Sequence, residues 1–312
     1  MRKQILSGCL SLTLSLFAAD AFAASPAQYS KRDFSGTWTN QSLTRLSRPG
    51  DFQQLEVSRE QAERYVKAQM TIGFTAEEKD KTHVDPNAGA PPAGDKDFGV
   101  KGYDPAWTSA GESFAVINGR YRTSHIVSPA NGQLPHRDPE KARSLAEARR
   151  VIYETGNGPY DGPEHANLSE RCLIGFGGTG GPGMLNTLYN NNYNFVSTKD
   201  HLAIVVEMAH DVRLIPIFAN QAQAQRSHRP DAIKPWLGDS VAWWESDTLV
   251  VETINVHPLQ GAAGPFPLSE KAKVTERLTR TGEKEILYRF TVDDPVHYTH
   301  PWTAELAFRY SD

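Results

Sequence analysis

Residues 241–253 read Val-Ala-Trp-Trp-Glu-Ser-Asp-Thr-Leu-Val-Val-Glu-Thr, and this stretch decides the fold. Two short apolar runs, 241–244 and 248–253, flank the turn residues Ser246 and Asp247, which predicts a β-hairpin. Six further runs of this kind lie around it, at 193–197, 201–208, 212–218, 272–279, 284–292 and 302–310. Such a series favours an antiparallel meander that closes into a barrel or folds into a sandwich, because an open sheet would leave its edges exposed. Of the two we expect the barrel, whose interior has room for side chains or one small ligand.

The first half of the chain contains fewer regular elements. We expect a strand at 34–40, and a helix over about 59–70 behind the capping-box pair Ser58 and Gln61. Asn118-Gly119 predicts a tight hairpin, and Asp138-Pro139 predicts the start of a helix that runs to about Glu154. Residues 75–111 are rich in Asp, Lys, Gly and Pro, which indicates a long loop around the domain. The predicted fold class is therefore mainly β, with an antiparallel barrel, two short helices and a long N-terminal wrapping loop.

The start of the chain has the order of a secretory signal. A basic start at Arg2-Lys3 precedes an apolar stretch and the small-x-small sequence Ala21-Phe22-Ala23. We expect residues 1–23 to be a cleaved signal peptide, 24–112 to pack on the barrel, and 113–312 to form it. The expected location is the periplasm or the exterior.

Charge and cysteine content exclude several partners. The net charge is −4 and no run of basic residues is present, so nucleic acid is not an expected partner. Of the two cysteines only Cys172 follows the expected cleavage site, so an internal disulfide is not expected. No later segment has the length of a transmembrane helix. We expect no cofactor, a small hydrophobic or aromatic ligand as the partner, and leave a homo-oligomer as an open alternative.

The richest group of polar residues lies in and between the second and third of the eight runs. Glu207, His210 and Arg213 are candidate catalytic residues, as general base and as an anchor for an anionic group. Candidate substrate-binding residues just before them are Tyr189, Asn190 and Asn192, since amides can donate to a polarised oxygen. The structural alternative, which we favour, is a hairpin with His210-Asp211 at its tip and a Glu207–Arg213 ion pair across the strands.

Two further groups supply the remaining candidates. Asp239 is a catalytic candidate, and Trp243 and Trp244 must point to opposite faces of their strand, so one of them can stack on a ligand. Near the C-terminus His300 is a catalytic candidate, and His297 and Trp302 are candidates for substrate binding. With His257, the two histidines could in principle gather a metal, but their spacing matches no specific zinc motif, and we predict no metal site.

The segment 175–183, Gly-Phe-Gly-Gly-Thr-Gly-Gly-Pro-Gly, resembles a phosphate-binding loop only in its glycine content. It lacks the Gly-Lys-Ser/Thr ending, so a flexible lid or a tight crossing is the expected role. No Gly-x-Ser-x-Gly elbow occurs, and Cys172 has no evident histidine partner, which gives little support to nucleophilic hydrolysis.

Several of these motifs together resemble a large, mostly uncharacterised family of secreted bacterial proteins that is frequent in sphingomonads and acidobacteria. The similar stretches are 122–127, 170–173, 189–192, 207–213, 236–240, 244–252, 294–295 and 301–305. The resemblance implies a lipocalin-like barrel and no particular reaction.

Two functional hypotheses, and a third without a site, follow. The first is a cofactor-independent lyase or isomerase that acts by acid–base chemistry on a small aromatic or terpenoid-like molecule inside the barrel. The second is a periplasmic binding or carrier protein that uses the same cavity without turnover. The third is a structural envelope protein with a packed interior and no pocket.

Overall fold

The computed structural model describes residues 29–69, 109–145, 147, 166–176 and 178–311. The expected signal peptide, nearly all of the expected loop at 75–111 and the end of the expected second helix lie outside these ranges. Within the described residues no helix has both the length and the apolar character needed to cross a membrane.

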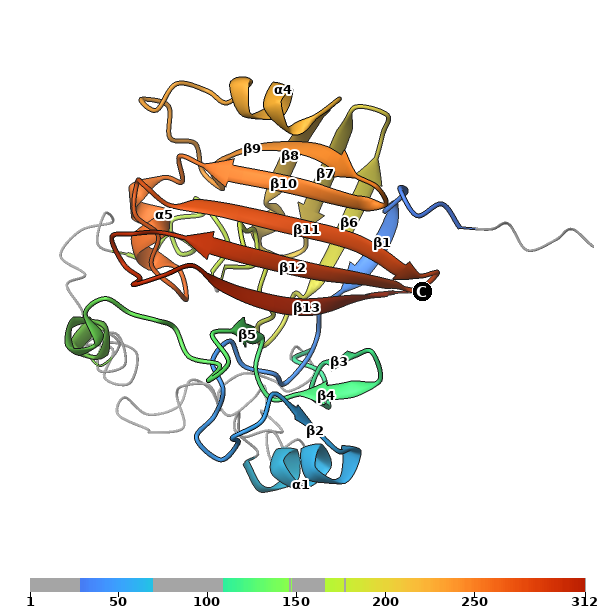
Figure 1. Cartoon of the computed structure of the whole chain (residues 1–312), viewed down its shortest axis with the longest axis vertical. Coiled ribbons are helices and arrows are strands. Elements are labelled where there is room, and N and C mark those ends of the chain that lie inside the picture. Colours follow the sequence, from blue (N-terminus) through green and yellow to red (C-terminus); the bar gives the residue numbers. More distant parts are fainter. Residues whose placement is uncertain (1–28, 70–108, 146, 148–165, 177, 312) are drawn as a thin grey trace, which may run out of the picture. The chain divides into compact units, whose positions relative to one another are not determined.

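The fold is mainly β and is built on a closed barrel of nine strands. The barrel strands, in spatial order, are β1 (Gly36–Thr39), β6 (Asn192–Ser197), β7 (His201–Val206), β8 (Val212–Phe218), β9 (Asp239–Glu245), β10 (Thr248–Ile254), β11 (Lys273–Gly282), β12 (Glu285–Asp293) and β13 (Trp302–Tyr310). Pairing of β1 with both β6 and β13 closes the ring, and the short β5 (Ile126–Ser128) adds to β13 (Figure 1). All eight predicted strands of the second half, and the predicted first strand, are confirmed.

The barrel is mixed, which corrects the expectation of a purely antiparallel one. Strands β8 and β9 run parallel, with Ile217 opposite Ala242. The connection 219–238 carries α4 (Gln221–Arg226), which packs on the outside of β9. Parallel neighbours need a crossover of a dozen or more residues, and this connection is long enough to make one. The length of 219–238 was therefore the signal that a simple hairpin did not fit.

Aromatic and aliphatic side chains fill the interior of the barrel. The fully buried residues of the core include Trp38, Tyr193, Phe195, Tyr288, Phe290, Trp302 and Phe308. Their rings contact one another edge-on, as Tyr193 and Phe308 do at a centroid distance of 5.0 Å. This differs from the open calyx expected from the sequence, because the alternation of each strand turns its largest side chains inward.

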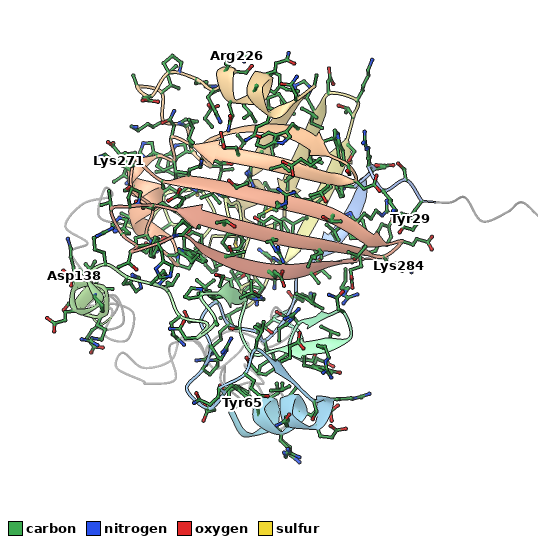
Figure 2. The ribbon with its side chains drawn as sticks, in the orientation of Figure 1. Tyr29, Tyr65, Asp138, Arg226, Lys271 and Lys284 are labelled. Atoms are coloured by element: carbon green, nitrogen blue, oxygen red, sulfur yellow. The ribbon has the colours of Figure 1, made fainter. Side chains whose placement is uncertain are left out.

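The barrel has two distinct ends. At one of them β7, β10 and β12 finish and β8, β9, β11 and β13 begin, and we call this the loop end. Figure 2 labels Lys271 there, just before β11, and Lys284 in the turn between β11 and β12 at the opposite end. At that opposite end Phe34 stacks on Trp244, and Arg280 donates to the backbone oxygen of Asp33.

A small three-stranded sheet and one helix form a second cluster. Its strands are β2 (Glu56–Val57), β4 (Arg120–Arg122) and β3 (Val116–Ile117), and its helix is α1 (Arg59–Gln69). The predicted capping box is confirmed, since Ser58 N donates to Gln61 Oε1 and Gln61 N donates to Ser58 Oγ. The predicted Asn-Gly turn is also confirmed, with φ of 52° at Asn118 and 73° at Gly119.

Two more helices lie near the loop end or lead into it. The helix predicted from Asp138-Pro139 begins at Pro139, and Asp138 Oδ1 caps it by accepting from Lys141 N at 2.9 Å. Helix α5 (Pro258–Ala263) follows β10 and is capped by His257, whose Nδ1 accepts from Leu259 N. A single 3-10 turn, η4 (Met208–His210), joins β7 to β8.

Candidate functional site

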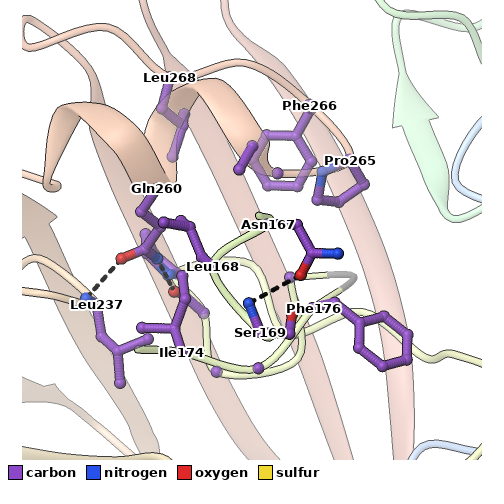
Figure 3. A pocket seen from close by; sticks show the side chains of 17 residues that line it. Asn167, Leu168, Ser169, Ile174, Phe176, Leu237, Gln260, Pro265, Phe266 and Leu268 are labelled. Carbon is purple, nitrogen blue, oxygen red and sulfur yellow. Dashed lines mark hydrogen bonds between the residues drawn. The ribbon is translucent and has the colours of Figure 1, made fainter. Parts of the chain in front are cut away.

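A cavity of about 110 Å³ lies at the loop end, between the glycine-rich segment 175–183 and α5 (Figure 3). Its wall is mainly apolar: Leu168, Ile174, Phe176, Leu237, Ala263, Pro265, Phe266 and Leu268. The polar residues Asn167, Ser169 and Gln260 complete it, together with glycines 175, 178, 180, 181 and 264 and with Pro182. We call it the first cavity.

Gln260 holds the walls of the first cavity together. Its Oε1 accepts from Leu237 N at 2.7 Å, and its Nε2 donates to Gly181 O at 2.9 Å, as drawn in Figure 3. One side chain of α5 therefore ties the glycine-rich segment to the start of β9. The cavity is built by contacts among three separate segments, which no local motif could predict.

The glycine-rich segment makes a tight crossing over the barrel. A Cβ atom on Gly181, where φ is +83°, would lie 2.6 Å from Arg213 Nη1, and one on Gly180 would lie 2.7 Å from Leu237 Cδ2. At Gly181 both the close approach to the buried Arg213 and the positive φ favour glycine, because any other residue would be strained there. This matches one of the two expected roles, the tight crossing.

Asp211 lies directly behind this segment. Its Oδ2 accepts from Gly175 N at 2.8 Å, and the same oxygen would lie 3.0 Å from a Cβ atom on Gly180. The side chain is partly buried, and burial raises the pKa of its carboxyl group above the ordinary value. Asp211 thus places a carboxyl group with increased proton affinity against the backbone of the first cavity.

Inside the barrel, below the glycine-rich segment, Arg213 pairs with Glu276 rather than with Glu207. The Nη1 and Nη2 atoms of Arg213 donate to the two carboxylate oxygens of Glu276 at 2.9 and 2.5 Å. Tyr288 donates its hydroxyl to Glu276 Oε1 at 2.6 Å and accepts from Met184 N. Burial alone would raise the pKa of Glu276, but the charge and hydrogen bonds of Arg213, with Tyr288, hold it below its ordinary value. The pair belongs to the packed core.

A second and larger cavity, of about 360 Å³, lies beside the first. It is lined by residues 42–46, by Ala110 and His125, by Phe176 and by residues 185–188. Phe176 belongs to the walls of both cavities, and its ring packs edge-on against Tyr189 at a centroid distance of 5.5 Å. The two cavities are therefore neighbours that share one aromatic side chain.

The wall of the second cavity contains three buried polar residues, Ser42, Thr44 and His125. The Nε2 atom of His125 lies 2.8 Å from Asn186 Oδ1, and its Nδ1 lies 3.1 Å from the backbone oxygen of Glu305. Burial lowers the pKa of His125 to about 4, so its imidazole is neutral near pH 7. The hydroxyl of Ser42 is buried and has no hydrogen-bond partner among the described residues.

The candidates Glu207 and His210 lie on the surface of the loop end. Glu207 is exposed and its Oε2 accepts from Asn192 N at 3.1 Å, while Glu207 N donates to Asn192 O. His210 is also exposed and has a φ of 56°. Asn190 lies close by, since its Nδ2 is 3.9 Å from Met208 Sδ. The structure thus groups Asn190, Asn192 and Glu207, but it separates them from the inward-pointing Arg213.

The expected Glu207–Arg213 ion pair is wrong. In β7 the side chains of Ile204 and Val206 point inward, so the next residue, Glu207, points out. In β8 Arg213 shares the inner face with Ile215. The two charges lie on opposite faces of the sheet, and the partner of Arg213 lies far away in the sequence.

Asp239 lies on the outer face of the barrel, against the segment that follows α4. Its Oδ2 accepts from Arg229 N and lies 2.8 Å from His228 Nδ1, and Glu252 Oε1 lies 3.4 Å from His228 Nε2. Burial alone would lower the pKa of His228, but the two carboxylates outweigh it and raise that pKa to about 9. This cluster, which we call the His228 clamp, fastens the segment after α4 to β9 and β10.

The aromatic candidates lie in different environments. Trp243 points outward and packs under α4 with Ala224, whereas Trp244 packs against the core and stacks on Phe34, as the alternation predicted. Trp302 is fully buried in the core. None of these three residues lines either cavity, but Tyr189 contacts the shared Phe176.

The three histidines considered for a metal have separate neighbours. His257 stacks on Trp236 at a centroid distance of 3.9 Å, and the ring of His297 contacts that of Tyr298. The Nδ1 atom of His300 forms a hydrogen bond with the hydroxyl of Thr299. In the ranges that the structure describes, no group of three or more His, Cys, Asp or Glu side chains has an arrangement that could hold a metal ion.

Sequence reasoning missed Glu276, His125, Ser42 and Gln260. A signal existed for Glu276, because it shares a strand face with Val274 and Leu278, and a lone acid in an apolar row indicates a buried partner. The other three are placed by contacts between distant segments and have no local signature.

Comparison with known proteins gives no match: no protein-family model, no curated protein and no solved structure resembles the chain significantly. The candidate site therefore rests on its own geometry.

Proposed function

We propose that this protein binds a small apolar or aromatic molecule in the first cavity at the loop end of the barrel. The observation that carries this proposal is a partly open, mainly apolar cavity formed by Leu168, Phe266 and their neighbours beside a barrel whose interior is filled. Ligand sites are typically concave and apolar with a few polar groups, and apolar cavities of this order accept a single aromatic ring. The barrel is the scaffold that positions the cavity, not the container of the ligand.

The exported location expected from residues 1–23 and the resemblance to secreted bacterial proteins agree with this proposal. They support a binding or carrier protein of the periplasm or the exterior.

Turnover of the ligand by acid–base chemistry, as a lyase or isomerase, is the second candidate function. The observation that favours it is Asp211, because its carboxyl group lies behind the cavity wall, bonded to Gly175 N, and burial raises its pKa, which makes it a stronger base than an ordinary aspartate. Asp211 replaces Glu207 and His210 as the residue to test, since both of those are exposed on the surface.

The test of binding uses benzyl alcohol and related single-ring aromatics with isothermal titration calorimetry. Ala263→Trp places a large ring at the wall of the first cavity, so we expect it to abolish binding. Leu259→Trp is the matched control, because Leu259 lies on the same helix but is exposed and does not line the cavity. Equal binding by both variants would refute the assignment of the cavity.

The test of turnover compares the wild type with Asp211→Asn. Product formation from a bound aromatic, lost in Asp211→Asn while binding persists, would establish the lyase or isomerase. Binding with no product from any member of a panel of lignin-derived aromatics would leave the protein as a carrier.

A further inference from the structure

The two cavities share the side chain of Phe176, and this contact has a consequence for the ligand. The first cavity, at about 110 Å³, has room for one ring, whereas the second, at about 360 Å³, is large enough for a longer body. A ligand that fills the first cavity and passes Phe176 would enter the second.

Ser42 gives the second cavity a polar anchor. Ser42 is one of the residues that line that cavity, and its hydroxyl is buried and has no hydrogen-bond partner among the described residues. A buried polar group without a partner is costly, and in native proteins it usually meets water or a ligand.

Arg45, the charged residue of that wall, is exposed, and the polar side chains beside Ser42 that are buried or half-buried already have partners. Asn186 Nδ2 donates to Ser42 O at 2.6 Å, and Thr187 Oγ1 donates to Tyr189 O at 2.7 Å. Thr44 Oγ1 donates to Arg122 O and accepts from Ala115 N. The Ser42 hydroxyl is thus the buried hydroxyl of this wall that has no hydrogen-bond partner among the described residues.

Half of the residues that line the second cavity are apolar. Leu46, Leu185 and Leu188 lie along it with Phe176, so the body of a ligand would contact mainly aliphatic and aromatic carbon. The combination of these apolar side chains with one buried, unpartnered hydroxyl favours a mainly apolar molecule that carries a single oxygen at its far end.

We propose that the first and second cavities are two compartments of one elongated site, and that its ligand is an aryl-alkyl molecule with a terminal hydroxyl or carbonyl oxygen bound by Ser42. The ring occupies the first cavity, the chain passes Phe176, and the oxygen reaches the Ser42 hydroxyl. This inference rests on the proposed function and adds to it the length and the chemical class of the ligand.

The experiment measures the affinity of a phenylalkanol series, from benzyl alcohol to 6-phenyl-1-hexanol, by calorimetry with the full chain. Each buried methylene should raise affinity about fourfold until the chain reaches Ser42. Ala110→Trp, which fills the second cavity, should remove this gain and leave benzyl alcohol unaffected. Ala219→Trp, at an exposed position that lines neither cavity, is the control.

Ser42→Ala tests the anchor. It should weaken binding of the longest alcohol about fivefold, the loss of one hydrogen bond, and should leave benzyl alcohol and the matching phenylalkane unchanged. Thermal unfolding of each variant establishes that it is folded before binding is compared.

The two proposals fail in different ways. If no aromatic probe binds, the proposed function is refuted. If benzyl alcohol binds but affinity does not rise along the series, or if Ala110→Trp weakens all probes equally, the two-compartment site alone is refuted. If affinity rises but Ser42→Ala has no effect on the long alcohols, Ser42 does not bind the oxygen of the ligand, and that assignment is refuted.

Discussion

The buried pair of Arg213 and Glu276 gives the sharpest energetic prediction. Their side chains are 2% and 1% exposed, and Glu276 accepts both guanidinium hydrogen bonds. In Glu276→Leu the cation keeps only the hydroxyls of Ser240 and Thr253, at 3.1 and 3.3 Å. Removing one partner of a buried pair costs about 3–5 kcal/mol, because the other charge is left without compensation.

The double variant Arg213→Met/Glu276→Leu isolates the cause. It removes both charges and restores an apolar interior, so its free energy of unfolding should return to within about 2 kcal/mol of the wild type. Tyr288 loses an acceptor in both variants, which costs about 1 kcal/mol and cancels in the comparison.

Urea unfolding followed by tryptophan fluorescence measures all three proteins. The single variant should lose about 3–5 kcal/mol, equivalent to a fall in Tm of roughly 6 to 20 °C for a domain of this size. A single variant within about 1 kcal/mol of the wild type would contradict the reasoning. So would a double variant that is no more stable than the single one.

Three other predictions concern pH, packing and the surface candidates. The pKa of His228 is raised from 6.5 to about 9, so the stability that its protonated ring gives to the fold is fully present below pH 6.5 and is lost as pH rises through about 9. In urea unfolding, the difference in free energy of unfolding between the wild type and His228→Gln should therefore shrink between these two pH values. Phe290→Ala should lower the free energy of unfolding by about 3–5 kcal/mol in the same assay, because Phe290 is fully buried. Leu214→Ala, on the exposed outer face, should change it by no more than about 0.5 kcal/mol, and equal losses would show that the interior is loosely packed. Glu207→Gln and His210→Ala should bind benzyl alcohol as the wild type does, because both residues are exposed and line neither cavity, and a loss of binding measured by calorimetry would return them to the site.

The barrel could be predicted because its signals are local. Turn residues such as Lys199-Asp200 and Ser246-Asp247 separate short alternating runs, and each run is one strand of the structure. The alternation also placed Trp243 and Trp244 on opposite faces correctly. What the pattern did not give was the direction of β9, which depends on the crossover through 219–238.

The site was harder to predict because its contacts join distant segments. Gln260 meets Gly181, and Arg213 meets Glu276, across separations of 79 and 63 residues. The sequence candidates were chosen for their chemistry, and most of them lie at the loop end, but Glu207 points outward and Asp239 belongs to the His228 clamp. The empty volume inside the barrel could not be predicted either, because strand alternation does not tell whether inward side chains leave a cavity or fill it.

The most direct test is a crystal structure of the protein soaked with an apolar heavy-atom probe such as iodobenzene. If the account is right, the anomalous iodine peak lies in the first cavity, near Leu168, Ala263 and Phe266. A peak among Trp38, Tyr193 and Phe308 in the middle of the barrel would contradict it, because it would show that the interior opens to receive the ligand.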